Sequence, residues 1–149
     1  MNRNKWYNST IIIYYMQERE PNQEQKSLTK QYLALSEQLD TSPIPDPQVL
    51  YEYLATAKQF YQQKTRQAGA DHEEAYKEAR YFEQLQNGSI QDKWEFCMIR
   101  RKVLFRLAQE HMKKGYTELT EQNYTKANNL RELACAIRRG QGSSPQGEG

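Results

Sequence analysis

Glycine, cysteine and histidine are all scarce in this chain of 149 residues. Four of its seven glycines fall after Arg139, so the sequence has no glycine-rich loop of the kind that cradles phosphate groups. Its two cysteines, Cys97 and Cys135, have no Cys-x-x-Cys or Cys/His spacing, which excludes a disulfide framework and a zinc site of the usual pattern. We expect reduced thiols in a cytoplasmic protein.

The two histidines stand apart from other metal-binding residues. A di-iron helical bundle needs a glutamate three residues before each histidine, and these positions hold Gly69 before His72 and Ala108 before His111. His72 also lacks the second histidine of a zinc-protease helix. The sequence leaves open whether a cysteine and a histidine lie close together in space, as a catalytic cysteine and its base would. We predict no metal, no cofactor and no catalytic residues, and hence a protein that is not an enzyme.

Long apolar runs are also missing. The longest, Ile11 to Met16, is far shorter than the roughly 18 residues of a membrane span. The basic start is followed by no small-residue cleavage site, so we predict neither a secretory signal nor a membrane partner. Apolar residues make up only 37% of the chain, and the mean hydropathy is -1.06. We therefore expect a thin core that is completed by a partner.

What the sequence does have is helical periodicity. Apolar residues in steps of three and four predict a helix over 24–39, and a proline-rich connector, 41–47, follows it. Asp46 is a predicted N-cap with Pro47 at the first helical position, which predicts a second helix that ends near Gly69. Similar start and stop signals predict further helices from Asp71 to Asn87, from Ile90 to about Lys114, and over 117–139.

The fold predicted from these patterns is all-α, with about five helices in a bundle or a short helical-hairpin array. Residues 24–139 form the helical domain, 1–23 a loose N-terminal arm, and 140–149 a disordered tail. Met16 precedes the first helical pattern, so residues 1–15 are candidates for being dispensable. For the last helix we predict that Leu119 and Ile137 are among the residues that face inward.

Apolar residues nearly encircle the fourth predicted helix. Trp94 and Met98 belong to one face and Ile99 and Val103 to another, which is typical of a central helix packed on two sides. Arg101 shares the face of Trp94 and Met98, where an unpaired charge would be costly. We predict that Arg101 pairs with a helix-borne carboxylate. The alternative is that it awaits an acidic group from another molecule.

Charge is divided unequally along the chain. Residues 1–92 carry 10 basic and 13 acidic side chains, whereas residues 93–139 carry 11 basic and 5 acidic ones. A basic stripe runs along the fourth helix at steps of four, three and four. The candidate interaction surface consists of this stripe and further residues of the basic half: Lys102, Arg106, Gln109, Lys113, Lys114, Arg131, Arg138 and Arg139.

Three interpretations of the stripe remain open at this point. It could follow a phosphate backbone, contact an acidic protein, or pair internally with the acidic third helix, which carries Glu73, Glu74, Glu78 and Glu83.

A DNA-reading helix-turn-helix around Gly115 is not supported, because His111 and Glu121 replace its usual small and apolar residues.

The stretch from Leu104 to Ala127 resembles one tetratricopeptide (TPR) helix pair. The positions that match its motif are Leu104, Leu107, Ala108, Gly115, Tyr124 and Ala127. The sequence departs from that motif at His111, Thr120 and Glu132. The resemblance implies a surface that binds peptides or proteins, without catalysis.

These observations predict a non-catalytic interaction or adaptor module that binds another protein or associates with itself. The alternative is a nucleic-acid-associated helical protein, such as a small ribonucleoprotein subunit, which contacts phosphates through the basic stripe.

Overall fold

The computed structural model describes residues 23–67 and 71–142. Five helices and no strand occur in these ranges: α2 (Gln23–Thr41), α3 (Pro47–Lys64), α4 (His72–Asn87), α5 (Ile90–Lys113) and α6 (Thr117–Gly142). The all-α prediction is confirmed. The predicted N-terminal segment (1–23) and the predicted C-terminal tail (140–149) lie outside these ranges, except that α2 begins at Gln23 and α6 continues to Gly142.

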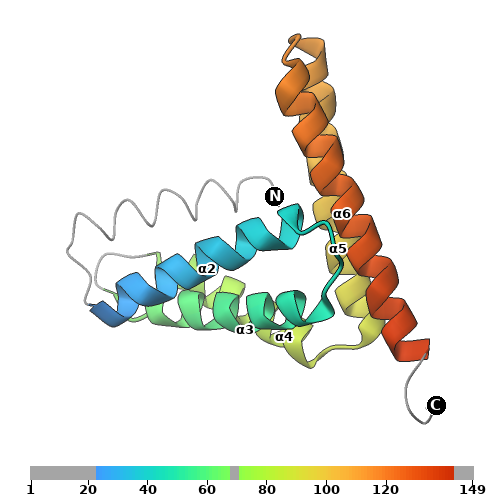
Figure 1. Cartoon of the computed structure of the whole chain (residues 1–149). Coiled ribbons are helices and arrows are strands. Elements are labelled where there is room, and N and C mark those ends of the chain that lie inside the picture. The colour runs from blue at the N-terminus through green and yellow to red at the C-terminus, as the bar shows by residue number, and fades with distance from the viewer. Residues whose placement is uncertain (1–22, 68–70, 143–149) are drawn as a thin grey trace.

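The helices form two parts (Figure 1). Helices α2, α3 and α4 lie alongside one another and make up the base. Helices α5 and α6 form a long antiparallel hairpin that crosses one end of the base and extends beyond it. We call residues 101–128, the part of the hairpin beyond its junction with α2, the arm.

The helix starts follow the predicted capping chemistry. Asp46 Oδ1 accepts a hydrogen bond from Gln48 N at 3.1 Å, which caps α3 in front of Pro47. At the start of α5, Ser89 and Asp92 form both halves of a capping box, and each side chain accepts from the other's backbone N–H at 3.1 Å. The turn from α4 to α5 is therefore fixed within two residues.

The base is built around α3. Its side chains Leu50, Leu54 and Phe60 are at most 1% exposed, and they pack between α2 and α4. The Phe60 ring stacks on Tyr32 of α2 with 4.5 Å between centroids, and Tyr61 stacks on Phe82 of α4 at 5.9 Å. The prediction that the fourth helix, α5, is the central one is therefore wrong for the base, where α3 has that role.

In α5 the buried side differs from both faces that were predicted to be packed. It lies between the face of Trp94 and Met98 and the face of Ile99 and Val103. Cys97, Leu104 and Ala108 are at most 2% exposed and pack against α6. Trp94, Met98 and Val103 are only half-buried, and Ile99 is 43% exposed. On α6, Ile137 is buried as predicted, but Leu119 is 42% exposed because it lies near the hairpin turn, where no helix of the described chain covers it.

The hairpin turn needs glycine at one position. Gly115 has φ of 79°, which L side chains rarely adopt. We expect Gly115→Ala to lower the free energy of unfolding by about 1 kcal/mol, measured by urea denaturation. Gly140→Ala is the matched control, because Gly140 is helical with open space around it and should be neutral or slightly stabilising. Equal losses in both variants would contradict this account of the turn.

Candidate interaction surface

A buried ion pair joins α5 to the base directly before the arm begins. Nε of Arg100 on α5 donates to Oδ1 of Asp40 on α2 at 2.7 Å, and its Nη2 donates to Asp40 Oδ2 at 3.1 Å. Nη2 also donates to the carbonyl oxygen and the hydroxyl of Ser36, both at 3.0 Å. Asn129 of α6 donates to the Asp40 carbonyl at 2.9 Å. Helices α5 and α6 therefore both bond to the C-terminal end of α2, and we call this cluster of Ser36, Asp40, Arg100 and Asn129 the joint.

Burial governs the electrostatics of the joint. Arg100 and Asp40 are each 4% exposed, and the guanidinium also lies 5.3 Å from the centre of the Tyr53 ring. Burial is the largest single influence and would lower the pKa of Arg100, but the Asp40 carboxylate together with Tyr53 and Tyr32 outweighs it, so the pKa is raised. Burial raises the pKa of the neighbouring Cys97 thiol to about 12, so this cysteine is neutral at physiological pH.

Arg101 has an environment different from the one predicted. It is half-buried and its guanidinium lies 4.5 Å above the centre of the Phe105 ring on the same helix. Its Nε has no hydrogen-bond partner, and no ion pair in the described part of the chain includes it. The prediction of a carboxylate partner for Arg101 is wrong. The arginine that pairs is the preceding one, because its position faces α2.

The basic stripe is fully on the outside of the arm. Lys102, Arg106, Gln109 and Lys113 are all exposed, on the side of α5 opposite its contact with α6. Within the described ranges no ion pair joins the stripe to α4, where Glu73 pairs instead with Lys77 at 3.6 Å. The acidic α4 therefore does not neutralise the stripe through direct contacts.

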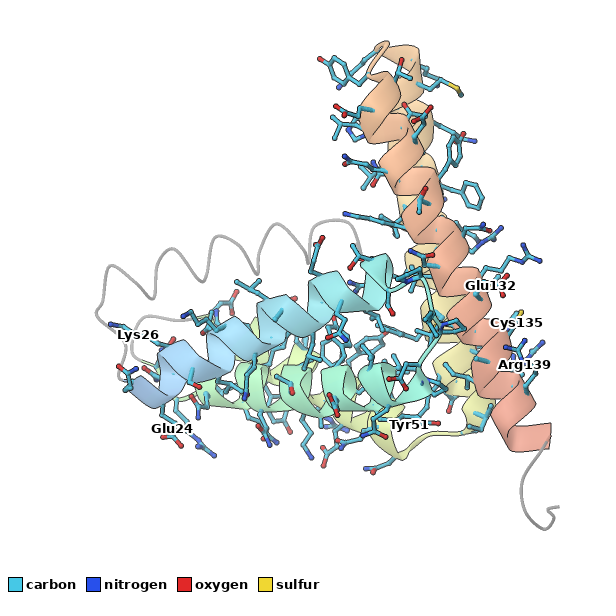
Figure 2. All side chains as sticks on the ribbon, viewed as in Figure 1. Glu24, Lys26, Tyr51, Glu132, Cys135 and Arg139 are labelled. Atoms are coloured by element: carbon cyan, nitrogen blue, oxygen red, sulfur yellow. The ribbon has the colours of Figure 1, made fainter. Side chains whose placement is uncertain are left out.

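The other candidate residues are dispersed. Lys114 is exposed at the hairpin turn, and Arg131 and Arg139 are exposed on α6. Figure 2 shows Arg139 on the outer side of α6, together with Glu132 and Cys135. Arg138 has an internal role, because its guanidinium lies 3.8 Å above the centre of the Trp94 ring and donates to Gln91 Oε1 at 2.8 Å. Lys114 thus directly follows the stripe at the end of α5, whereas the three arginines are on the other helix of the hairpin.

Large apolar side chains are exposed around the tip of the arm. The exposed fractions are 56% for Met112, 51% for Tyr116 and 42% for Leu119. These residues were not predicted as interaction residues. The sequence signal that could have identified them is the clustering of three bulky residues next to the turn glycine, where two helix ends leave little protein to cover them.

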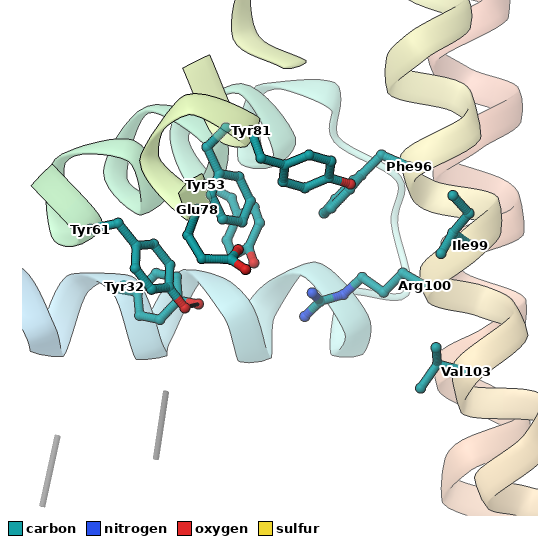
Figure 3. Close-up of a pocket in the computed structure, with 10 residues that line it drawn as sticks. Tyr32, Tyr53, Tyr61, Glu78, Tyr81, Phe96, Ile99, Arg100 and Val103 are labelled. Carbon is teal, nitrogen blue, oxygen red and sulfur yellow. Dashed lines mark hydrogen bonds between the residues drawn. The ribbon is translucent and has the colours of Figure 1, made fainter. Parts of the chain in front are cut away.

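A groove separates α4 from α5 at the corner where the hairpin leaves the base. It has a volume of about 310 Å³, and Leu85, Phe96 and Ile99 give it an apolar lining. Asp92 and Glu95 are exposed along its α5 side. Figure 3 shows Tyr81 reaching from α4 toward Phe96, and both residues line the groove. The groove is therefore apolar inside with acidic groups on one edge.

Tyr81 also lines a smaller cavity, which has a volume of about 60 Å³ (Figure 3). Tyr32, Tyr53, Tyr61 and Glu78 line it, and the Tyr32 and Tyr61 hydroxyl oxygens are 3.5 Å apart. Burial raises the pKa of Tyr53, so the phenol is neutral at physiological pH. The cavity has room for a few water molecules and is well below the roughly 300 Å³ of a typical small-molecule site. The cavity is therefore too small to be a typical small-molecule site.

Other classes of site are not indicated in the described ranges. They contain no group of three or more histidine, cysteine or acidic residues placed to hold a metal ion. None of their helices combines the length and the apolar character that crossing a membrane requires. Comparison with protein-family models, curated proteins and solved structures finds no match to this chain. The arm and the groove beside it are thus the candidate functional features of the described ranges.

Proposed function

We propose that this protein is a non-catalytic interaction module whose arm is the docking element. The observation that carries the proposal is the arm itself, a two-helix projection that shows a basic stripe on its outer side and exposed Met112, Tyr116 and Leu119 around its tip. Apolar side chains of this size are usually covered when they cluster, and such clusters typically mark protein interaction sites. The TPR resemblance, which remains a prediction, supports the same class of function.

The joint explains how a projecting hairpin can serve as a docking element. Breaking a buried ion pair leaves an uncompensated charge and is strongly unfavourable, so the contacts between Arg100 and Asp40 fix the direction of α5 relative to α2. A rigid arm loses little conformational entropy when it binds, which favours affinity. The base is therefore the part that positions the arm.

Lysine labelling in cells tests the proposal, because the chain contains its own control. The arm carries exposed Lys102, Lys113 and Lys114, and the base carries exposed Lys26, Lys30 and Lys77. We expect an amine-reactive reagent to modify the arm lysines several-fold more slowly in cells than in dilute purified protein, as quantified by mass spectrometry. The base lysines should be modified at the same rate in both. Equal ratios for the two groups would contradict the proposal.

The stripe is exposed and has no ion pair within the described ranges, which favours a second candidate function, in which the arm binds nucleic acid. Lys102, Arg106 and Lys113 span about 16 Å along α5, enough to contact successive phosphates of one strand. Nuclease treatment before labelling separates the two functions. If the partner is nucleic acid, the treatment should abolish the protection of Lys102 and Lys113. If the partner is a protein, the protection should persist.

A further inference from the structure

We propose that two copies of this chain associate through the outer face of α5, which consists of Asp92, Glu95, Ile99, Lys102 and Arg106. This inference rests on the proposed function and names its partner as a second copy. All five side chains are exposed, and their steps of three, four, three and four place them on one side of the helix. They include an apolar residue, Ile99, which is 43% exposed.

The charges on this face are self-complementary. Two acidic residues precede Ile99 and two basic residues follow it, with Asp92 and Arg106 each seven positions away. If a second copy lies antiparallel with Ile99 at the two-fold axis, the basic half of each α5 faces the acidic half of the other. Glu95 then lies opposite Lys102 of the second copy, and Asp92 lies opposite its Arg106. Such a symmetric contact satisfies both halves of the face at once.

The surroundings of the face agree with this arrangement. Asp92 and Glu95 lie on the edge of the groove between α4 and α5, whereas Lys102 and Arg106 belong to the arm. An antiparallel pair therefore places the arm of each copy along the groove of the other, where Leu85 and Phe96 offer an apolar lining. The groove and the basic stripe, which are unrelated features in one molecule, become complementary parts of one interface.

Light scattering of the full chain over a range of concentrations and salt tests the proposal. We expect a dimer that dissociates as salt is raised, because the pairs are solvent-exposed and screened. Glu95→Lys and Lys102→Glu should each weaken dimerisation by about tenfold or more, because each places like charges opposite one another. Glu83→Lys is the matched control. It raises the net charge by the same amount as Glu95→Lys, at an exposed position of α4 outside the groove, and it should leave the dimer unchanged.

The decisive part of the experiment mixes the Glu95→Lys and Lys102→Glu variants. A Glu95→Lys copy carries lysine at both positions and a Lys102→Glu copy carries glutamate at both, so the mixture should form heterodimers with about wild-type affinity. A monomeric wild type at every concentration, or a mixture that stays as weak as its components, would overturn the proposal. If the wild type is monomeric while the arm lysines are still protected in cells, only this inference fails. If protection is absent as well, the proposed function fails with it.

Discussion

Arg100→Ala should lower the free energy of unfolding by about 3 to 5 kcal/mol, measured by urea denaturation of the full chain. The substitution leaves the Asp40 carboxylate buried at 4% exposure, without the Nε and Nη2 donors that hold both of its oxygens. It also removes the donor to the Ser36 hydroxyl. An uncompensated carboxylate in this environment is costly, and the loss should exceed that of any exposed substitution in α5.

A double replacement separates two contributions to the free energy of unfolding: the cost of leaving one buried charge unpaired, and the net contribution of the intact ion pair. In Arg100→Met/Asp40→Leu both charges are removed and the space is filled by apolar side chains of similar size. We expect this variant to be close to wild type in stability, or more stable, because the desolvation of two ions no longer has to be offset. If Arg100→Ala cost less than about 1 kcal/mol, the joint would not be a buried ion pair of the kind described here.

The second large effect is expected in the base. Phe60→Ala should lower the free energy of unfolding by about 3 to 5 kcal/mol, because the ring is 1% exposed and stacks on Tyr32 at 4.5 Å. The cavity left behind lies in the middle of α3, where α2 and α4 are both packed against the lost ring. Urea denaturation measures this loss in the same way as for the joint.

Phe105→Ala provides the comparison within the arm. Phe105 is half-buried and contacts Tyr124 with 5.5 Å between the ring centroids, so removing it opens no enclosed cavity. Its cost should be less than half that of Phe60→Ala, because the loss of apolar contact is smaller and water can enter. Similar costs at the two positions would show that the arm is packed as tightly as the base, contrary to this description.

Local sequence signals were sufficient for the helices. The steps of four, three and four through Leu28, Tyr32, Leu35 and Leu39 predicted α2, and all of these side chains except the half-buried Leu35 are buried in it. The cap at Asp46 and the glycine turn at Gly115 also follow from chemistry within a few residues. These features are predictable because each depends on backbone groups that neighbouring residues satisfy.

The joint was not predictable in this way. Arg100 and Asp40 are 60 residues apart, and no local pattern links them. Apolar residues surround α5 on nearly every side, so periodicity could not identify the buried direction, and it selected Arg101 in place of Arg100. One residue rotates a side chain by about 100° around a helix, which is enough to move it from the joint to the surface of the arm.

The candidate surface was predicted in part. The steps between Lys102, Arg106 and Lys113 show that they share a helix face, and the structure places them together as exposed residues. Arg138 was grouped with them by charge alone, yet it packs on Trp94. The groove is lined by residues of both α4 and α5, so it depends on how the two helices are placed in space, which periodicity within one helix does not indicate.

Photo-crosslinking from the arm tests the central claim most directly. Met112 at the tip and Tyr76 on the base have nearly equal exposure, 56% and 55%, so a photoreactive phenylalanine analogue at each position is a matched pair. Binding through the arm predicts covalent adducts in cells from position 112 and not from position 76. Lys102→Glu, Arg106→Glu and Lys113→Glu together should abolish those adducts. Equal yields from both positions, or no adduct from position 112, would contradict it.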